Sequence, residues 1–234
     1  MIQHVYERAV KSQLAGAVYV ATDSPEIYGV VEGFGGKAVM TSADHASGTD
    51  RVAEAAMKIS ASGSAPGGED IIVNIQGDEP LIRPEMIDDV IRLMEDERAS
   101  IGTLAKRIED PEEIADPNVV KVVFDREGFA LYFSRSPIPF HRAIFRDMGR
   151  GINEADMPAV SMFKHIGIYA FRKTTLLDFS KLPPAKLENI EKLEQLRALE
   201  SGLRIKVGET EFETVGVDTK NDIERVEKCL SISL

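Results

Sequence analysis

Residues 73–80 read VNIQGDEP, and this stretch decides the fold. It belongs to an apolar run that begins at Ile71, and the length and composition of the run are typical of a buried strand. The strand has to stop at Gly77 and Pro80, because glycine lets the backbone approach a ligand closely and proline cannot donate a hydrogen bond to a neighbouring strand. The sequence therefore predicts a strand that ends in a tight turn.

Two carboxylates, Asp78 and Glu79, lie in this turn. In open α/β folds, ligands bind at the carboxyl ends of the strands. A carboxylate at that edge suits Mg²⁺, a hard cation that proteins hold with one or two carboxylates and the phosphates of a substrate. An ordinary acidic turn between a strand and a helix explains the same residues, so the motif alone leaves both interpretations open.

The composition is that of a globular protein. Of the 234 residues, 43% are hydrophobic and 29% are charged, which is enough for a sizeable core. The formal net charge of −11 argues against a surface that binds nucleic acid or anionic lipid. The one cysteine, Cys229, cannot form an internal disulfide, and no apolar run is long enough to span a membrane. We therefore expect a protein of a reducing compartment, without membrane insertion.

Helical and strand patterns alternate through the first hundred residues. Ser24 is a typical N-cap, since Pro25 and Glu26 follow it. Short strands separated by amphipathic helices predict an α/β fold with a mostly parallel sheet flanked by helices. The expected helices cover residues 2–14, 25 onwards, 49–59 and 84–98, and the expected strands cover 17–21, 37–40 and the run from 71.

Strand patterns dominate after about residue 100. The segment 125–128, DREG, predicts a hairpin turn between two strands. The polar, glycine-containing segment 140–159 is typical of a mobile arm, and Gly202 ends a helix expected over 187–200. Further strands are expected over 101–106, 119–124, 129–133, 166–171 and 204–207, and a closing helix over 220–230.

Six motifs follow one another along the chain: MTSADHASGTDR (40–51), NIQGDEP (74–80), VVKVVFDREGFALYFSRS (119–136), KHIGIYAFR (164–172), LExxExLEQLR (187–197) and GVDT (216–219). In this order and at these spacings, they resemble the 3-deoxy-manno-octulosonate cytidylyltransferases, also called CMP-KDO synthetases. The resemblance covers essentially the whole chain. It implies a Rossmann-like, mixed, mostly parallel sheet flanked by helices, of the nucleotide-diphospho-sugar transferase type, with a β-rich dimerisation arm.

The resemblance also implies an activity. Nucleotidyltransferases of this family join CTP and KDO to give CMP-KDO and pyrophosphate, with Mg²⁺, in the cytoplasm of bacteria that make lipopolysaccharide. The resemblance further implies a homodimer. It implies that the chain binds small-molecule substrates, CTP and KDO, and not nucleic acid. In a single domain, residues 1–100 would form the nucleotide-binding half, and 101–234 the sugar-acid-binding and dimerisation half. Two alternatives stay open: a cytidylyltransferase for another sugar acid, such as 8-amino KDO or a sialic acid, and a truncated, non-catalytic dimer.

One element of the family pattern is missing from this sequence. Family members begin with a strand and a phosphate-binding loop that contains Arg, Ser, Gly and Lys and holds the triphosphate of CTP. Here Met1 lies within the helix that should follow that loop. We therefore expect the chain as written to be a poor catalyst, because donors and cations at the β- and γ-phosphates would be absent. We also expect unpaired backbone in the sheet.

The candidate catalytic and metal-binding residues are Asp78 and Asp218. Each follows an apolar strand pattern and lies in a turn, so both can reach one Mg²⁺. In the implied reaction, a sugar hydroxyl attacks the α-phosphate of CTP in line, and such transfers depend on positioning and charge neutralisation. By itself, Asp218 is better explained as the N-cap of the helix that follows it, and the resemblance reverses that preference.

The candidate nucleotide-binding residues are Ser47, Gly48, Arg51 and Gln76. The first two offer small side chains and N–H groups for base edges or phosphate, and Arg51 offers a positive charge. A capping loop before a helix and a strand-end glutamine explain the same residues without a ligand.

The candidate sugar-acid-binding residues combine a cation, aromatic groups and helix carboxylates. Arg135 follows a strand and would pair with the sugar carboxylate. The alternatives are a structural histidine, a core phenol and an exposed pair between Glu194 and Arg197. The full set is Arg135, His165, Tyr169, Glu191, Glu194 and Gln195.

Overall fold

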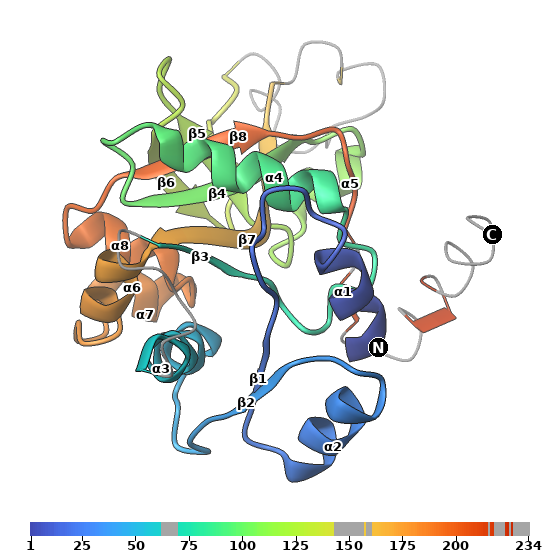
Figure 1. The fold of residues 1–234 in the computed structure, drawn as a ribbon. Helices are drawn as coiled ribbons and strands as arrows, with labels where there is room; N and C mark the ends of the chain where they lie inside the picture. Colours follow the sequence, from blue (N-terminus) through green and yellow to red (C-terminus); the bar gives the residue numbers. More distant parts are fainter. Residues whose placement is uncertain are drawn as a thin grey trace. The chain divides into compact units, whose positions relative to one another are not determined.

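The structure, a computed structural model, describes residues 1–61, 70–142, 157, 161–214, 216–217, 223–224 and 226. Along these residues, helices and strands alternate as far as residue 124, and two strands, three helices and one strand follow (Figure 1). The helices are α1 (Ile2–Ala9), α2 (Pro25–Gly33), α3 (Gly48–Ala61), α4 (Pro84–Arg92), the 3-10 helix η1 (Leu93–Glu95), α5 (Pro111–Ala115), α6 (Lys173–Phe179), α7 (Lys186–Glu191) and α8 (Gln195–Glu200). The strands are β1 (Val20–Thr22), β2 (Ala38–Met40), β3 (Ile71–Asn74), β4 (Ile101–Arg107), β5 (Lys121–Phe124), β6 (Ala130–Ser134), β7 (Phe163–Arg172) and β8 (Ile205–Glu209).

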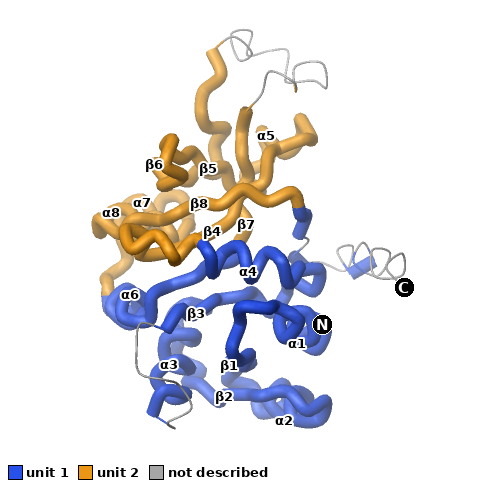
Figure 2. Tube along the Cα trace, turned by 45° about the horizontal axis from the view of Figure 1, so that its top comes forward, with its two compact units in different colours: residues 1–92, 168–181, 212–234 blue, residues 93–167, 182–211 orange. Residues whose placement is uncertain are grey.

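Two compact units make up the chain (Figure 2). Unit 1 comprises residues 1–92, 168–181 and 212–234, and unit 2 comprises 93–167 and 182–211. Strand β7 begins in unit 2 and ends in unit 1. The first boundary therefore lies a few residues before the expected one near residue 100, and two later segments return to unit 1.

In unit 1, helix α3 packs on the strands β1, β2 and β3. Strands β1 and β2 pair in parallel, with Val20 opposite Ala38. Strand β3 pairs antiparallel with the last part of β7, with Asn74 opposite Tyr169. Helix α3 packs on β1, β2 and β3, while α2 packs on β1 and β2. The chain enters α3 directly from the carboxyl end of β2, through residues 41–47.

The start of α2 confirms its predicted N-cap, whereas the expected end of α1 was wrong. The Ser24 hydroxyl accepts a hydrogen bond from the Ile27 N–H, with Pro25 in the first turn. Helix α1 ends at Ala9 instead of continuing to residue 14. The reason is Asp88 on α4, whose carboxylate binds main-chain N–H groups that follow α1.

Asp88 redirects the backbone that follows α1. Its carboxylate accepts from the Ser12 hydroxyl at 2.5 Å and from the N–H groups of Gln13 and Leu14, each at 3.0 Å. Burial raises the pKa of Asp88, but hydrogen bonds from Ser12, Leu14 and Gln13 outweigh it and lower this pKa below its usual value. These N–H groups are thus satisfied outside a helix, which ends α1 early.

Unit 2 contains the strand order β6-β5-β7-β4-β8, in which β7 contributes its first residues. Strands β4 and β8 are parallel, with Ile101 opposite Ile205. Strand β5 runs antiparallel to β6 and to β7, with Lys121 opposite both Ser134 and Lys164. The mixed α/β fold is confirmed. The expectation of a mostly parallel sheet does not hold for β3, β5, β6 and β7, because a hairpin joins β5 to β6 and β7 runs antiparallel to β3 and β5.

The predicted hairpin turn at 125–128 is confirmed. Gly128 has φ 79°, a left-handed conformation that favours glycine. The Asp125 carboxylate accepts from the N–H groups of Glu127 at 2.9 Å and of Phe129 at 2.8 Å. The Asp125 side chain thus supplies the acceptor for two main-chain N–H groups of the turn, as is typical of an aspartate at this position.

The single helix expected over 187–200 was wrong, because the chain forms two short helices, α7 and α8. Lys192 adopts φ 55° between them, a left-handed conformation that ends α7. Burial of Leu193 and the ion pair between Glu188 and Arg197, at 2.6 Å, make the break favourable. The helix expected over 84–98 also ends earlier, at Arg92, and continues only as η1.

Part of the expected chain organisation lies outside the described residues. This applies to most of the arm expected over 140–159 and most of the closing helix expected over 220–230. Among the helices that the structure describes, none has the length and apolar character needed to cross a bilayer.

Candidate active site

The turn after β3 lies against the segment that precedes Asp218. The Val217 N–H donates to the main-chain oxygen of Asp78 at 2.9 Å. A Cβ atom placed on Gly216 would lie 3.8 Å from Oε1 of Glu79, so the two segments are in close contact. Asp218 itself lies outside the described residues. The structure therefore brings Gly216 and Val217 next to the turn at Asp78 and Glu79, although the two segments are far apart in the sequence.

The binding of Mg²⁺ by Asp78 and Asp218 stays a prediction. Among the described residues, no group of three or more His, Cys, Asp or Glu side chains is arranged to hold a metal. A pair of carboxylates is nevertheless sufficient when phosphates complete the octahedral coordination. The hydrogen bond between Val217 and Asp78 is the observation that supports such a pair, since it anchors the residue before Asp218 at the turn that carries Asp78.

Two of the predicted nucleotide-binding residues lie side by side in unit 1. A Cβ atom on Gly48 would lie 3.9 Å from Oε1 of Gln76, so glycine leaves this side chain room at the start of α3. Ser47 caps the same helix, because its hydroxyl accepts from the Asp50 N–H at 3.2 Å. The capping contact of Ser47 is thus present, and its role toward a nucleotide stays a prediction.

Arg51 contacts the ends of two strands. Its Nη1 donates to Oγ1 of Thr41 at 2.7 Å and to the main-chain oxygen of Ser42 at 3.3 Å, both directly after β2. The same nitrogen lies 3.2 Å from Oδ1 of Asp23, which follows β1. In this arrangement Arg51 connects the carboxyl ends of β1 and β2.

Tyr169 is the predicted sugar-acid residue that belongs to unit 1. It lies opposite Asn74 in the β3–β7 ladder, and Asn74 is the first residue of the NIQGDEP motif. Its ring centroid is 6.0 Å from that of Phe171. The half-buried phenol therefore flanks the strand from which the Asp78 turn continues.

His165 lies inside β7 and not at its entrance. Its Nε2 is 2.9 Å from Oγ1 of Thr103, and its ring packs edge-to-face against Phe133. Burial lowers the pKa of His165 to about 3. The imidazole is therefore neutral at physiological pH and offers a hydrogen bond, not a charge.

Arg135 and Glu191 are brought together in unit 2. The guanidinium of Arg135 donates to the main-chain oxygens of Glu191 at 2.7 Å and Pro117 at 2.8 Å. In return, the Glu191 carboxylate accepts from the Ser134 hydroxyl at 2.7 Å and from the Arg135 N–H at 2.9 Å. Because its carbonyl partners are neutral, the guanidinium keeps its positive charge for an anionic ligand.

The break at Lys192 separates Glu191, the last residue of α7, from Glu194 and Gln195 at the start of α8. Gln195 is buried at the start of α8. Glu194 lies 3.3 Å from Arg197, which is itself buried and pairs more closely with Glu188. The Glu194–Arg197 pair considered above is therefore present, but it is not an exposed pair, because the Arg197 side chain is only 9% exposed.

Lys121 is a residue that the sequence reasoning missed. It is fully buried, and its Nζ donates to the main-chain oxygens of Asp116 at 2.6 Å, Val119 at 2.7 Å and Arg135 at 3.2 Å. Burial lowers the pKa of Lys121. It holds the backbone of Arg135, and the signal that would have revealed it is a lysine inside the apolar run VVKVVF (119–124).

These features define an α/β protein of the nucleotidyltransferase type. The mixed sheets are flanked by helices, and acidic and glycine-containing turns meet at the carboxyl end of β3. The chain belongs to the cytidylyltransferase family, whose profile matches residues 1–205.

Relatives and solved structures agree with the resemblance derived from the six motifs. A 3-deoxy-manno-octulosonate cytidylyltransferase of Thermodesulfovibrio yellowstonii is 54% identical over 99% of this chain and 88% of the relative. One of Geobacter sulfurreducens is 51% identical over 97% of this chain and 87% of the relative. The predicted family is therefore confirmed.

Two solved structures extend the comparison to the fold. CMP:2-keto-3-deoxy-manno-octonic acid synthetase complexed with CTP has a TM-score of 0.84 and 39% identity, and the match covers 100% of this chain and 88% of that one. The 4-diphosphocytidyl-2C-methyl-D-erythritol synthase of Anaerococcus prevotii has a TM-score of 0.55 and 10% identity, over 98% of this chain and 89% of that one. The second likeness concerns the fold alone.

Proposed function

We propose that this chain transfers the cytidylyl group of CTP to KDO, giving CMP-KDO and pyrophosphate for lipopolysaccharide biosynthesis. The observation that carries the proposal is the contact between Val217 and Asp78, made in a chain 54% identical to a 3-deoxy-manno-octulosonate cytidylyltransferase. In the reaction, a hydroxyl oxygen of the sugar acid bonds to the α-phosphorus as the bond from that phosphorus to the pyrophosphate oxygen breaks. The hydroxyl proton leaves to solvent.

In this proposal, Asp78 and Asp218 hold Mg²⁺. When bound, the ion neutralises charge on the α-phosphate and lowers the pKa of the attacking hydroxyl. Gly48 and Gln76 contact the nucleotide, which their close approach at the start of α3 supports. Ser47 lies next to Gly48 in the chain and contributes through the same loop.

The sugar acid would be bound by residues of unit 2. Arg135 presents a positive charge to the sugar carboxylate, while Glu191 keeps the Arg135 backbone in place. His165 contributes a neutral hydrogen-bonding group, and Gln195 an amide. We further propose a cytoplasmic homodimer, on the basis of the family to which the chain belongs.

The proposed function is tested by pyrophosphate release from CTP and KDO in the presence of Mg²⁺. We expect pyrophosphate release with this pair only at the low rate predicted above for a poor catalyst, and markedly less when UTP replaces CTP. Parallel assays with 8-amino KDO and with a sialic acid identify the preferred acceptor. If kcat/KM is higher with 8-amino KDO or a sialic acid than with KDO, that acid is the preferred acceptor and KDO is not. Binding of KDO without any turnover would support a non-catalytic protein instead.

A further inference from the structure

One face of α3 holds the loop that leads into this helix. Arg51, Glu54 and Lys58 are three and four residues apart, so their side chains leave α3 on the same side. The loop 41–47 connects β2 to α3. We call these three side chains together the α3 clasp, and Arg51 holds the beginning of the loop through Thr41 and Ser42.

Glu54 is the centre of the α3 clasp. Its Oε2 accepts from the N–H of Ser42 at 2.8 Å and contacts Nε2 of His45, while its Oε1 lies 2.7 Å from Nζ of Lys58. Lys58 also donates to the main-chain oxygen of Met40 at 2.7 Å. Hydrogen bonds from Lys58, Ser42 and His45 lower the pKa of Glu54 to about 2, so this group is a carboxylate at every pH of interest.

The far end of the same loop lies at the candidate nucleotide site. Ser47 caps α3, and a Cβ atom on Gly48 would lie 3.9 Å from Oε1 of Gln76. A shift of the loop against α3 would therefore move Ser47, which directly precedes Gly48 and is itself a candidate nucleotide-binding residue. The α3 clasp fixes the loop at Ser42 and His45, only a few residues before that contact.

We propose that Glu54 is a positioning residue for CTP, which holds the loop 41–47 in the shape that the nucleotide requires. This inference rests on the proposed function and deepens it. Glu54 acts through Ser42 and His45 and not by touching the substrate. The α3 clasp includes none of the predicted sugar-acid residues. The effect of Glu54 should therefore fall on the binding of CTP and not on the binding of KDO.

The substitution Glu54→Gln tests this role. Glutamine keeps the size of the side chain and an acceptor for the Ser42 N–H, but it removes the charge that attracts Lys58 and His45. We expect KM for CTP to rise about tenfold, because weaker charge-assisted hydrogen bonds to Glu54 leave the loop 41–47 less well positioned for the nucleotide. The kcat at saturating substrates and KM for KDO should stay within about twofold. The Kd for CTP, measured by calorimetry without KDO, should rise by the same factor as KM.

The matched control is Glu85→Gln, the same change at an exposed position of α4 in the same unit. This control should leave kcat, both KM values and the Kd for CTP unchanged. If Glu54→Gln does not fold, Lys58→Met removes the cation of the pair, whose side chain is 51% exposed, and should raise the Kd for CTP without changing KM for KDO.

The outcomes separate the positioning role from the proposed function. An unchanged Kd and KM for CTP in Glu54→Gln, with normal turnover by the unsubstituted protein, would overturn the role of Glu54 alone. Equal losses for CTP and KDO, accompanied by a lower melting temperature, would also overturn it, because they indicate a general structural effect. If the unsubstituted protein neither binds CTP nor releases pyrophosphate, the proposed function itself fails.

Discussion

Asp78 combines a structural contact and a predicted chemical role in one residue. Its main-chain oxygen binds the Val217 N–H, which an asparagine at this position would preserve. Asp78→Asn should therefore keep the fold but remove one negative charge from the metal site. We expect kcat/KM to fall at least about a hundredfold, because charge neutralisation is the main contribution to phosphoryl-type transfer.

Pyrophosphate release at saturating Mg²⁺ measures the effect of Asp78→Asn, with circular dichroism as the check of folding. The control is Asp89→Asn on α4, which removes an exposed carboxylate paired with Arg92. This control should leave kcat/KM unchanged. Turnover of Asp78→Asn close to that of the control would exclude Asp78 from the metal site.

His165 makes the stability of the protein depend on pH. Burial lowers its pKa from 6.5 to about 3 in the folded state. Because the folded pKa lies below the unfolded one, its stabilising contribution is complete above pH 6.5 and is lost as the pH falls from there toward 3. We expect nitrogen chemical shifts of a neutral imidazole at about pH 5.

The free energy of unfolding should also fall less steeply between these pH values in His165→Gln, because glutamine does not titrate. Denaturant unfolding at a series of pH values measures this slope for both proteins. A protonated imidazole in the folded protein at about pH 5 would contradict the buried, neutral state.

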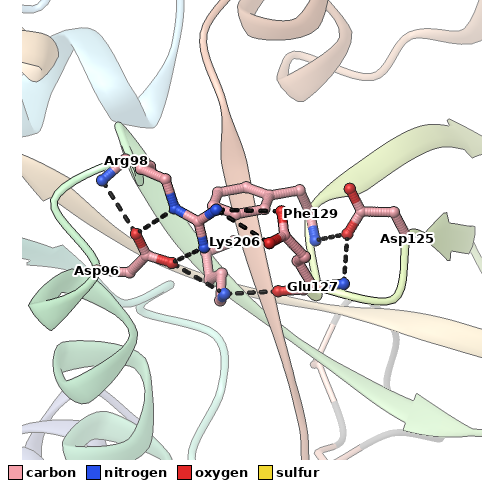
Figure 3. Close-up of polar contacts among 6 residues, drawn as sticks. All are labelled: Asp96, Arg98, Asp125, Glu127, Phe129 and Lys206. Carbon is pink, nitrogen blue, oxygen red and sulfur yellow. Dashed lines mark hydrogen bonds and ion pairs between the residues drawn. The ribbon is translucent and has the colours of Figure 1, made fainter.

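The β5–β6 hairpin is held by a cluster of charges around one aromatic ring (Figure 3). The Phe129 ring is contacted by Arg204 at 3.6 Å, Lys206 at 4.5 Å and Arg98 at 5.1 Å, measured to the ring centroid. Asp96 pairs with both Arg98, at 2.9 Å, and Lys206, at 3.1 Å. The hairpin turn is thereby attached to the start of β8 and to the segment after η1.

Phe129→Leu should lower the free energy of unfolding by about 1–3 kcal/mol, through a smaller buried volume and the lost cation–π contacts. The ring is only 4% exposed, so solvent cannot replace these contacts. Leu131→Ala, on β6 of the same hairpin but 63% exposed, is the control and should change stability by less than about 0.5 kcal/mol. Equal effects of the two substitutions in urea unfolding would refute the role of the cluster.

For the whole molecule, ligand binding should appear as stabilisation against unfolding. A ligand that binds only the folded state stabilises it by about 2.7 kcal/mol at a concentration one hundred times its Kd. We expect CTP with Mg²⁺ to raise the melting temperature, and EDTA to remove most of that increase. Differential scanning fluorimetry with CTP, with and without EDTA, measures the difference.

UTP at the same concentration serves as the control for the effect of CTP on the melting temperature. It carries the same triphosphate, so a smaller increase than with CTP isolates the contribution of the base. Identical melting temperatures with CTP in the presence and absence of EDTA would argue against a magnesium ion shared by the protein and the nucleotide.

Much of the element order was predictable because its signals act within a few residues. The N-cap at Ser24 depends on its own hydroxyl and the Ile27 N–H three residues later. The hairpin turn depends on Asp125 and Gly128, which are three residues apart. Apolar periodicity and turn chemistry are local properties, so the sequence alone determined where most strands and turns lie, and the ordered motifs identified the family.

The ends of helices and the partners of charged groups were decided only by the tertiary structure. Helix α1 stops because Asp88, more than seventy residues away, binds the N–H groups of Gln13 and Leu14. The expected helix over 187–200 breaks at Lys192, where burial of Leu193 outweighs helix propensity. In each case a distant group competes with the local preference, and this competition is resolved only once the chain is packed.

The candidate site shows the same division. The motif around Asp78 pointed to a ligand-binding turn from the sequence alone, but its contact with Val217 crosses well over a hundred residues. The role of Glu54 also depends on the folded chain, because only there do Ser42 and His45 meet its carboxylate. Residue types and local spacing determined which chemistry is available to this protein, whereas long-range hydrogen bonds, which form only in the packed state, decided which of those residues meet.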